Sequence, residues 1–363
     1  MLDTAILKNE EKAVFALRAL YRQYGYLPYK MSKFEDYEYY IRNKDFLVSD
    51  RIITFNDTNG RLLALKPDVT LSIIKNGEDV PGCKRKVYYN ENVYRVSGNT
   101  HQFKEIMQAG LECIGDIDVY DIFEAVSLAA QSLALISEDF VLQISHLGIL
   151  SAALDRVCPD KVFQQKALNF IESKNAHDLT RLCQEYGVEE APLVQLLAAY
   201  GKRDQVIAVL EELGCDQKAL EELKEISGLL DGLPWSDKIV FDLSLVSNMN
   251  YYNGIVFRGF LSGICERVLA GGQYDKLMEK LERHTGAIGF ALYLDLLEQM
   301  PVERSKYDVD VLLIYDADAD KTTVAKAVAE LTAQGKTVSA QKSIPEKLRY
   351  QQLITLSKEG TAC

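Results

Sequence analysis

The order of apolar and polar positions predicts a helix followed by paired strands. Residues 8–24 have helical spacing and end at Gly25, with four apolar side chains on one face: Val14, Leu17, Leu20 and Tyr21. Two apolar runs within 53–67 flank a turn-forming stretch at 56–60 and predict a hairpin. The β-branched and aromatic runs at 86–96 and 105–115 predict a second hairpin, and 120–137 is typical of a long helix. We therefore expect an α+β fold, a mainly antiparallel sheet packed by helices.

Between residues 152 and 235 the pattern changes to short helices. They are expected at 166–175, 178–187, 192–201, 204–214 and 217–230. Several end at a glycine suited to a left-handed cap, namely Gly187, Gly201 and Gly214. Strand patterning resumes at 238–246 and 251–260, so we interpret the helical stretch as an insertion into the sheet domain.

After Pro301 the pattern reads strand, helix, strand and helix, at 308–316, 321–335, 336–341 and 345–358. Such a fragment of about 60 residues is small for an independent core. The predicted division is a core made of 1–151 and 236–300, a helical insertion at 152–235, and a truncated α/β C-terminal domain at 301–363.

Composition narrows the class of protein. Of the 363 residues, 48% are hydrophobic, which is typical of a globular protein. The net charge of −12 disfavours a nucleic-acid partner. We interpret the basic run Lys84-Arg85-Lys86 as a solvated turn. Seven cysteines without a C-x-x-C pair, no secretory signal and no apolar run of about 20 residues predict a cytoplasmic protein without membrane contact.

Three separated stretches carry the candidate chemistry. The first is 65–70, leaving a hairpin into a helix; the second is 108–112, with Tyr94-Arg95 on the preceding strand. The third begins at Asn250-Tyr251-Tyr252-Asn253-Gly254 and continues through 271–275 and 286–291. On a strand, Gln108, Gly110 and Glu112 point to one face, and the glycine is expected to leave room for a ligand. Gly271, Gly272 and Gly289 permit close backbone approach. Each piece alone is more often structural, so the argument depends on their order.

Taken in that order, these stretches resemble histidyl-tRNA synthetase over residues 10–300: its arginine-proline-glutamate-glycine-threonine strand end, its second and third motifs and its histidine-specific tyrosine pair. They are still more similar to a paralogue of that enzyme, the regulatory subunit of ATP phosphoribosyltransferase, in which aspartate is usual where Asp68 stands. The resemblance implies a class II aminoacyl-tRNA synthetase-like core.

The resemblance also implies a histidine site. The α-ammonium group of histidine would lie against Asp68, Thr70 and Gln108, which accept hydrogen bonds. Glu112 and Tyr251 would contact the imidazole nitrogens, and Tyr252, Tyr274 and Asp275 would line or brace the site. Whether histidine occupies this pocket or an interface with a partner stays open.

Departures from the synthetase pattern affect the groups that would hold ATP. The family arginine before the tyrosine pair aligns with Ser247, followed by Asn248-Met249-Asn250, and the arginine of the third motif aligns with Leu296. Arg95 survives in the second motif as a residual nucleotide-site residue, but Ser97 replaces a glutamate and the loop 98–102 lacks arginines. Gln273 replaces a further arginine and Ser32 the proline of the first motif. Because each lost charge-stabilising donor lowers a rate by about 10²–10³, we expect no adenylation and no catalytic residue.

The sequence thus favours a non-catalytic regulatory subunit. The resemblance implies that it partners the short-form catalytic subunit in a hetero-octamer, forms a self-dimer, activates the first step of histidine biosynthesis and helps mediate allosteric feedback inhibition by histidine, without binding tRNA. One alternative is a divergent histidyl-tRNA synthetase or adenylating enzyme, for which Arg258 or Arg267 would be the displaced arginine. Another is a paralogue that regulates a different target.

Other chemistries lack a signal. His101, His146, His177 and His284 share no metal-ligand spacing, so no metal is expected. Neither a phosphate-binding G-x-x-x-x-G-K loop nor a G-x-S-x-G elbow occurs. We expect no cofactor.

Overall fold

A computed structural model describes residues 7–44, 47, 52–77, 82–96, 100–247, 249, 251–301 and 306–356. The chain divides into two compact units, Met1–Met300 and Pro301–Cys363. Each unit is described by itself.

The first unit is built on a nine-stranded sheet in the order β1-β5-β6-β12-β11-β10-β7-β9-β8. All neighbouring strands are antiparallel except the pairs β1–β5 and β7–β9. The strands are β1 (Leu27–Pro28), β5 (Arg85–Val96), β6 (Phe103–Gly115), β7 (Phe140–His146), β8 (Tyr200–Gly201), β9 (Ile239–Asp242), β10 (Ile255–Leu261), β11 (Leu269–Gln273) and β12 (Gly286–Tyr293). The predicted hairpin of 86–96 with 105–115 is confirmed as β5–β6, and the α+β fold is confirmed.

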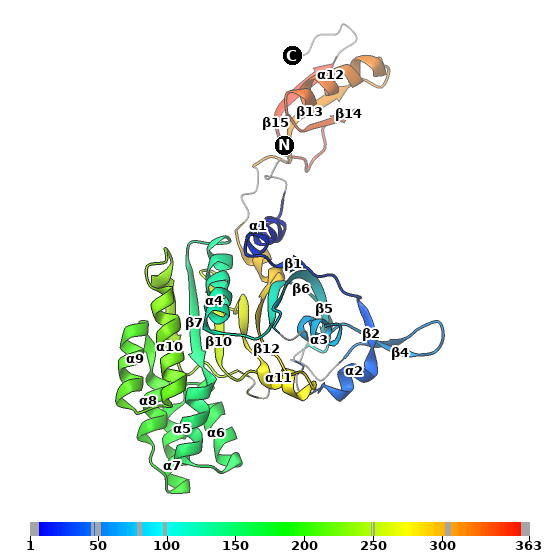
Figure 1. Cartoon of the computed structure of the whole chain (residues 1–363). Helices are drawn as coiled ribbons and strands as arrows, with labels where there is room; N and C mark the ends of the chain where they lie inside the picture. Colours follow the sequence, from blue (N-terminus) through cyan, green and yellow to red (C-terminus); the bar gives the residue numbers. More distant parts are fainter. Residues whose placement is uncertain are drawn as a thin grey trace. The chain divides into compact units, whose positions relative to one another are not determined.

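Helices α1 (Asn9–Gln23) and α4 (Val119–Ala134) cover one face of this sheet (Figure 1). Both were predicted from helical spacing. Asp118 is the N-cap of α4 and forms a capping box with Asp121. The Asp118 carboxylate accepts a hydrogen bond from the Asp121 N–H, and the Asp121 carboxylate accepts one from the Asp118 N–H. Leu111, Cys113 and Phe290 point toward the helices and are buried. The opposite face of β6 is therefore left for the polar residues Gln108 and Glu112.

The basic run at 84–86 is not a solvated turn, as the sequence analysis had it. Arg85 and Lys86 begin β5, and the Lys84 ammonium lies 2.6 Å from Asp121 and 3.0 Å from Asp118 at the start of α4. Lys86 lies 2.6 Å from Glu124. These ion pairs neutralise the run and join β5 to α4, which leaves little charge for an anionic partner.

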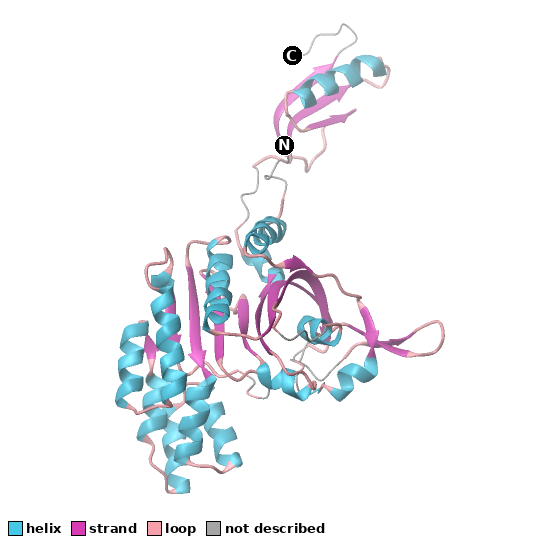
Figure 2. Cartoon of the chain, in the orientation of Figure 1, coloured by secondary structure: helices cyan, strands magenta, loops and turns pink. Residues whose placement is uncertain are grey.

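Six α-helices and the short 3₁₀ helix η3 (Ser236–Lys238) separate β7 from β9, with the short strand β8 between the fourth and fifth α-helices. Figure 2 shows these α-helices gathered beside the sheet. They are α5 (Leu147–Val157), α6 (Lys161–Glu172), α7 (Ala176–Tyr186), α8 (Ala191–Ala198), α9 (Arg203–Glu212) and α10 (Gln217–Leu230). Gly187 caps α7 in the left-handed conformation with φ 65°, as predicted. Gly201 is not a helix cap: it lies in β8 and pairs with Phe241 of β9. The pairing with a sheet edge, which sequence spacing does not reveal, decides its conformation.

A second, three-stranded sheet in the order β2-β4-β3 lies beside the large one. Its strands are β2 (Phe34–Asp36), β3 (Thr54–Asn56) and β4 (Leu62–Leu65), so the predicted hairpin of 53–67 is confirmed. Helices α2 (Tyr37–Arg42) and α3 (Val69–Lys75) flank it, and Figure 1 shows α3 inside the curve of β5 and β6.

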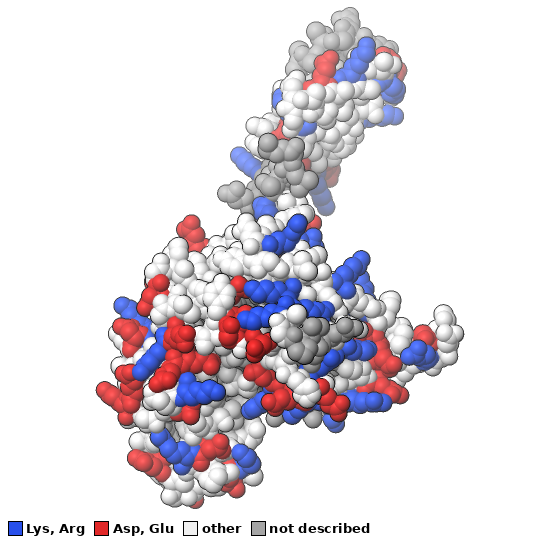
Figure 3. Space-filling view, viewed as in Figure 1, with Lys and Arg blue, Asp and Glu red and all other residues white. Residues whose placement is uncertain are grey.

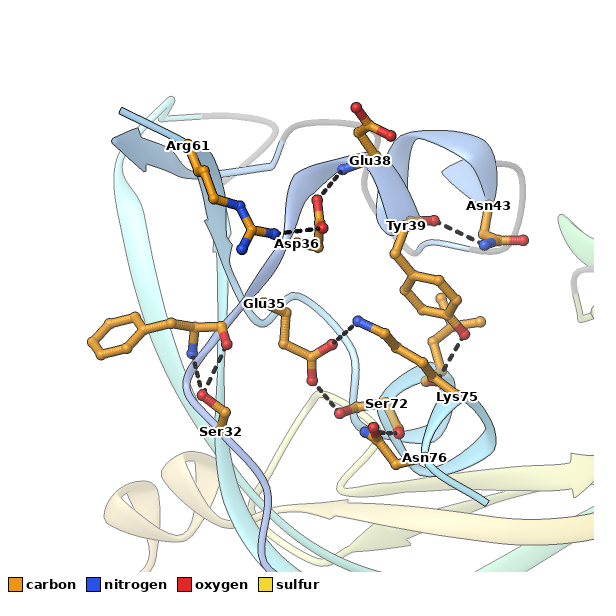
Figure 4. A network of polar contacts seen from close by, with 12 residues as sticks. Ser32, Glu35, Asp36, Glu38, Tyr39, Asn43, Arg61, Ser72, Lys75 and Asn76 are labelled. Carbon is orange, nitrogen blue, oxygen red and sulfur yellow. Dashed lines mark hydrogen bonds and ion pairs between the residues drawn. The ribbon is translucent and has the colours of Figure 1, made fainter. Parts of the chain in front are cut away.

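A polar network joins this small sheet to α3 (Figure 4). The buried Glu35 carboxylate accepts a hydrogen bond from Ser72 and lies 3.4 Å from the Lys75 ammonium. Ser32, which stands where the related synthetases have proline, accepts the Phe34 N–H at 3.1 Å and donates to the Phe34 carbonyl. The network anchors α3, whose first turn carries two candidate site residues.

The described residues of the second unit, 301 and 306–356, form a three-stranded parallel sheet, β14-β13-β15, and one helix. Its elements are β13 (Val309–Tyr315), α12 (Lys321–Ala333), β14 (Val338–Gln341) and β15 (Tyr350–Leu356). The predicted final helix at 345–358 is wrong, because its described C-terminal half is β15. Ile354 and Leu356 both pack on the α12 side of β15, a period of two, and strand pairing with buried β13 outweighs the helical propensity of the segment.

Candidate functional site

A cavity of about 530 Å³ lies over the sheet face opposite α4. Strand register places Gln108 opposite Tyr293, and Glu112 opposite Gly289. Residues directly opposite each other in antiparallel strands share a face, so these side chains meet on the cavity floor. Between them the floor is made of small residues, Gly289, Ala291, Ala270 and Gly271. The three stretches that the sequence analysis combined therefore converge here.

Asp68 and Thr70 reach the cavity from the first turn of α3. Asp68 is the N-cap: its Oδ1 accepts the Leu71 N–H at 2.9 Å, which orients the carboxylate. Its Oδ2 lies 4.0 Å from the Arg95 guanidinium, whose Nε donates to the Pro67 carbonyl at 3.0 Å. Burial raises the pKa of Asp68, and the charge of Arg95 opposes that shift. Arg95 thus supports the strand end that presents Asp68.

Glu112 is the most buried carboxyl group in the cavity, with 2% of its surface exposed. Thr70 Oγ1 and Tyr274 OH donate to its two oxygens, each at 2.6 Å. Burial raises the pKa of Glu112 to about 8, although both hydrogen bonds favour the ionised form. At neutral pH the empty cavity therefore holds a mostly protonated carboxyl group that can exchange a proton with a ligand.

Three tyrosines form the apolar wall. The Tyr251 ring lies 4.5 Å from that of Tyr252 and 5.7 Å from that of Tyr274, centroid to centroid. Burial raises the pKa of all three phenols, so they stay neutral donors. The loop that carries the first two is held by Asp275, whose carboxylate accepts the Asn253 amide at 3.0 Å and the Ala287 N–H at 2.9 Å.

Glycines shape the floor differently from the prediction. Room over Gly110 was expected, but the Tyr89 hydroxyl and the Phe290 carbonyl already fill it: a Cβ there would lie 2.5 Å and 2.2 Å from them. The ligand space lies instead on the neighbouring strands. Gly271 and Gly289 do permit close backbone approach, since a Cβ on either would lie within 2.5 Å of a carbonyl oxygen of the adjacent strand.

Side chains at the positions of the missing arginines have structural tasks or no charge. Gln273 Oε1 accepts the Ile255 N–H at 2.8 Å over Gly254, so its amide points into the sheet. Leu296 lies in the 3₁₀ helix η4 (Leu294–Gln299) and packs against the main core. Ser247 lines the cavity without a charge. The candidates Ser97, Gly98, Asn99, Asn248 and Asn250 lie outside the described residues.

The structure adds residues that the sequence analysis did not assign to the site. Helix α6, from the helical segment, lines the cavity with Gln165, Leu168, Asn169 and Glu172. Arg258 and Arg267, named only as candidates for an enzymatic alternative, also line it. Tyr89 could have been found, because it pairs with Gly110 across β5 and β6. The α6 residues carry no sequence signal, since they come from a segment about 60 positions beyond β6.

Metal binding and membrane insertion find no support within the parts of the chain that the structure describes. No group of three or more His, Cys, Asp or Glu side chains there is placed to hold a metal ion. None of the described helices has the length and apolar character needed to cross a membrane. His146 has a structural task, because its Nδ1 accepts the Gly148 N–H at 3.1 Å and caps α5.

Comparisons with known proteins agree with this architecture. The model of the histidyl-tRNA synthetase family matches residues 2–297. An ATP phosphoribosyltransferase regulatory subunit from Oceanobacillus iheyensis is 30% identical over 288 residues, 76% of this chain and 69% of that protein. One from Clostridium kluyveri is 28% identical over 344 residues and covers 87% of both chains.

Solved structures share the fold. An ATP phosphoribosyltransferase regulatory subunit/histidyl-tRNA synthetase from Bacillus halodurans superposes with a TM-score of 0.78 at 23% identity, over 98% of this chain and 96% of that one. The HisG:HisZ complex of ATP phosphoribosyltransferase from Thermotoga maritima gives 0.64 at 21% identity, over 78% and 97%. With the family match and the relatives above, this chain belongs to the histidyl-tRNA synthetase family, in its branch of ATP phosphoribosyltransferase regulatory subunits.

Proposed function

We propose that this chain is a non-catalytic regulatory subunit that activates the short-form catalytic subunit of ATP phosphoribosyltransferase and helps mediate its feedback inhibition by histidine. One observation carries the proposal. Asp68, Gln108 and Glu112 form a buried polar pocket whose groups suit the ammonium group and polar side chain of an amino acid. At the positions where the resemblance calls for arginines, this chain has Ser247, Gln273 and Leu296. Such a site can recognise an amino acid while lacking the charge to activate it.

Histidine is the proposed ligand. Its ammonium group would donate hydrogen bonds to Asp68 Oδ2 and to the side-chain carbonyl of Gln108. Thr70 would hold Glu112 in place through the hydrogen bond that it donates to that carboxyl group. The imidazole of histidine would exchange a hydrogen bond with Glu112 and lie against Tyr251, with Tyr252 and Tyr274 closing the wall. An apolar amino acid would bury Glu112 further without offering it a hydrogen bond, a cost that makes the site selective.

Regulation then follows from differential affinity. If histidine binds one arrangement of the assembly more tightly than the other, it shifts the population toward that arrangement by the ratio of the two affinities. We propose that the arrangement favoured by histidine is the less active one, and that helix α6, which lines the pocket, is the element that senses occupancy.

The proposed partner is the catalytic subunit, in a hetero-octamer that contains self-dimers of this chain, in the cytoplasm and without tRNA. The similarity of this chain to the HisG:HisZ complex from Thermotoga maritima supports a catalytic subunit as the partner. Figure 3 shows acidic and basic side chains intermingled on the visible face, without a broad basic area of the sort that nucleic-acid binding uses. We also propose the division into a core at 1–151 and 236–300, an insertion at 152–235 and a C-terminal domain at 301–363.

Co-expression with a short-form catalytic subunit tests the proposed assembly. A stable complex on size-exclusion chromatography, retained at 0.5 M salt, is the expected result because obligate interfaces are mostly apolar. Separate elution of the two proteins would contradict the proposal.

A second candidate is an amino-acid-adenylating enzyme, which one observation favours: Arg258 and Arg267 line the cavity together with Arg95. Against it, the positions where the resemblance calls for arginines hold Ser247, Gln273 and Leu296, and Arg95 braces Pro67. Exchange of pyrophosphate into ATP in the presence of histidine discriminates the two. We expect no exchange above background, and robust exchange would establish the enzyme.

A further inference from the structure

Two arginines stand at the end of the cavity far from Glu112. Arg258 lies on β10 opposite Ala270 of β11, which lies opposite Ala291 of β12. Arg267 comes two residues before β11. Strands β6 and β10 are three steps apart in the sheet, about 14 Å at the usual spacing. Because the intervening floor carries only alanine and glycine, the long side chains from both ends reach over an open, amino-acid-sized gap.

Arg258 is held in place but not saturated. Its guanidinium donates to the carbonyl of Val246, the neighbour of Ser247, which also lines the cavity. Its only ion pair among the described residues is with Glu172 Oε1 of α6, at 3.6 Å. The Glu172 side chain is 54% exposed and that of Arg258 19%, so the acid is the more easily solvated partner. A guanidinium has five donors, and most of these stay available.

The charges that line the cavity are unevenly placed, with Glu112 held by the neutral donors Thr70 and Tyr274 and far from the two arginines. Asp68 is paired with Arg95, and Glu172 with Arg258. Arg267 has no ion pair within the described part of the chain, although it lines the same cavity. Its charge disfavours the charged form of Arg258, which together with burial lowers the pKa of that group. The arginine end is therefore electropositive, while the far end presents the Asp68 carboxylate, a polarity that fits a zwitterion.

We propose that Arg258 and Arg267 bind the α-carboxylate of the amino acid whose ammonium group Asp68 and Gln108 hold, and that this carboxylate displaces Glu172 from Arg258. The inference rests on the proposed function and adds its regulation. Glu172 is the last residue of α6, so the exchange releases the end of a helix whose side chains form part of the cavity wall. Ligand occupancy thereby reaches the helical segment 152–235 through one carboxylate-for-carboxylate substitution.

Calorimetric titration of the full chain with L-histidine and with L-histidinol, which has a hydroxymethyl group in place of the carboxylate, tests the assignment. We expect the unaltered chain to bind histidine about 10- to 100-fold more tightly than histidinol, the effect of a charge-assisted hydrogen bond or two. In Arg258→Gln and in Arg267→Gln the preference for histidine should fall about tenfold or more, with histidinol binding little changed. Arg181→Gln, which removes an exposed arginine paired with Asp178 outside the cavity, should keep the preference.

Glu172→Gln is expected to change histidine affinity in the opposite direction to the arginine variants. Removing the competing carboxylate should strengthen histidine binding several-fold and leave histidinol binding unchanged. A preference for histidine that is the same in the unaltered chain and in both arginine variants overturns the inference while the histidine pocket stands. An unaltered chain that binds neither ligand overturns the pocket itself and the inference with it. Arg267 is exposed, so its variant is expected to fold even if Arg258→Gln lowers the melting temperature.

Discussion

At the scale of single residues, the proton on Glu112 is the feature with the clearest consequence. The carboxyl group is buried beneath Thr70 and Tyr274, and burial raises its pKa to about 8. The imidazole of a free histidine has a pKa of about 6.5. Between these values the empty pocket and the free ligand together hold one proton. The complex needs that single proton for the hydrogen bond between Glu112 and the imidazole.

Histidine affinity should therefore be highest between about pH 6.5 and 8. Above the pKa of Glu112 the free partners hold no proton and must bind one, and below the pKa of imidazole they hold two and must lose one, so affinity falls about tenfold per pH unit on either side. Calorimetry from pH 5.5 to 9.5 measures this. Glu112→Gln should remove the part of the alkaline limb that begins near pH 8 and leave the part that comes from deprotonation of the ligand's own ammonium group. A profile flat from pH 7 to 9.5 in the unaltered chain would contradict the assigned role of Glu112.

At the scale of elements, the cavity exists because β11 and β12 carry only glycine and alanine over the middle of the sheet. Gly289 shows this best. The Glu112 carboxylate lies over it, so that a Cβ would stand 1.7 Å from Glu112 Oε2 and 2.5 Å from the Leu111 carbonyl. Any side chain there must push Glu112 off the floor and separate two strands.

Gly289→Ala should destabilise the chain by about 1–3 kcal/mol, the usual effect of overpacking, and weaken histidine binding at least tenfold. Thermal unfolding and calorimetry measure the two effects. Gly228→Ala is the matched control, because nothing lies within 4 Å of its Cβ position in α10 and alanine is the better helix former. The control should raise stability by up to about 1 kcal/mol and leave binding unchanged. An alanine at 289 that binds histidine normally would show that Glu112 does not need this floor.

Elements with a clear period could be predicted from the sequence, and those decided by distant partners could not. The hairpins β3–β4 and β5–β6 and the helices α1 and α4 have local signals in periodicity and turn residues. Strand β7 was missed, since its alternating residues at 140–146 directly precede a helix without a turn signal. β15 was predicted as helix because YQQLITL is also compatible with one, and only its pairing with β13 makes it a strand.

The candidate site follows the same division. Asp68, Gln108, Glu112 and the tyrosines could be brought together because each lies in a stretch that resembles a motif of histidyl-tRNA synthetase, and the resemblance implied that these motifs share one pocket. The prediction of open space over Gly110 was wrong, because the Tyr89 side chain fills that space and its rotamer depends on tertiary packing. The α6 wall and the contact between Arg258 and Glu172 depend on tertiary structure alone.

At the scale of the whole molecule, the chain combines a polar cavity with a net charge of −12, and its acidic and basic side chains are intermingled on the face that Figure 3 shows. Every residue that lines the cavity lies in the first compact unit, so a ligand bound there would contact residues of that unit. The net charge of −12 and the neutralised basic run at 84–86 leave a complementary protein surface as the expected partner. Histidine would then act on a partner's activity, with no chemistry in this chain.

The most direct test of that claim is the ATP phosphoribosyltransferase activity of a short-form catalytic subunit, measured against increasing amounts of this chain, with and without L-histidine. We predict that activity rises to a plateau at a fixed ratio of the two chains and that histidine lowers the plateau. Asp68→Asn should still activate but require about tenfold more histidine for the same inhibition, because the ammonium group loses its charged partner. Activity that is the same with and without the chain would contradict the account.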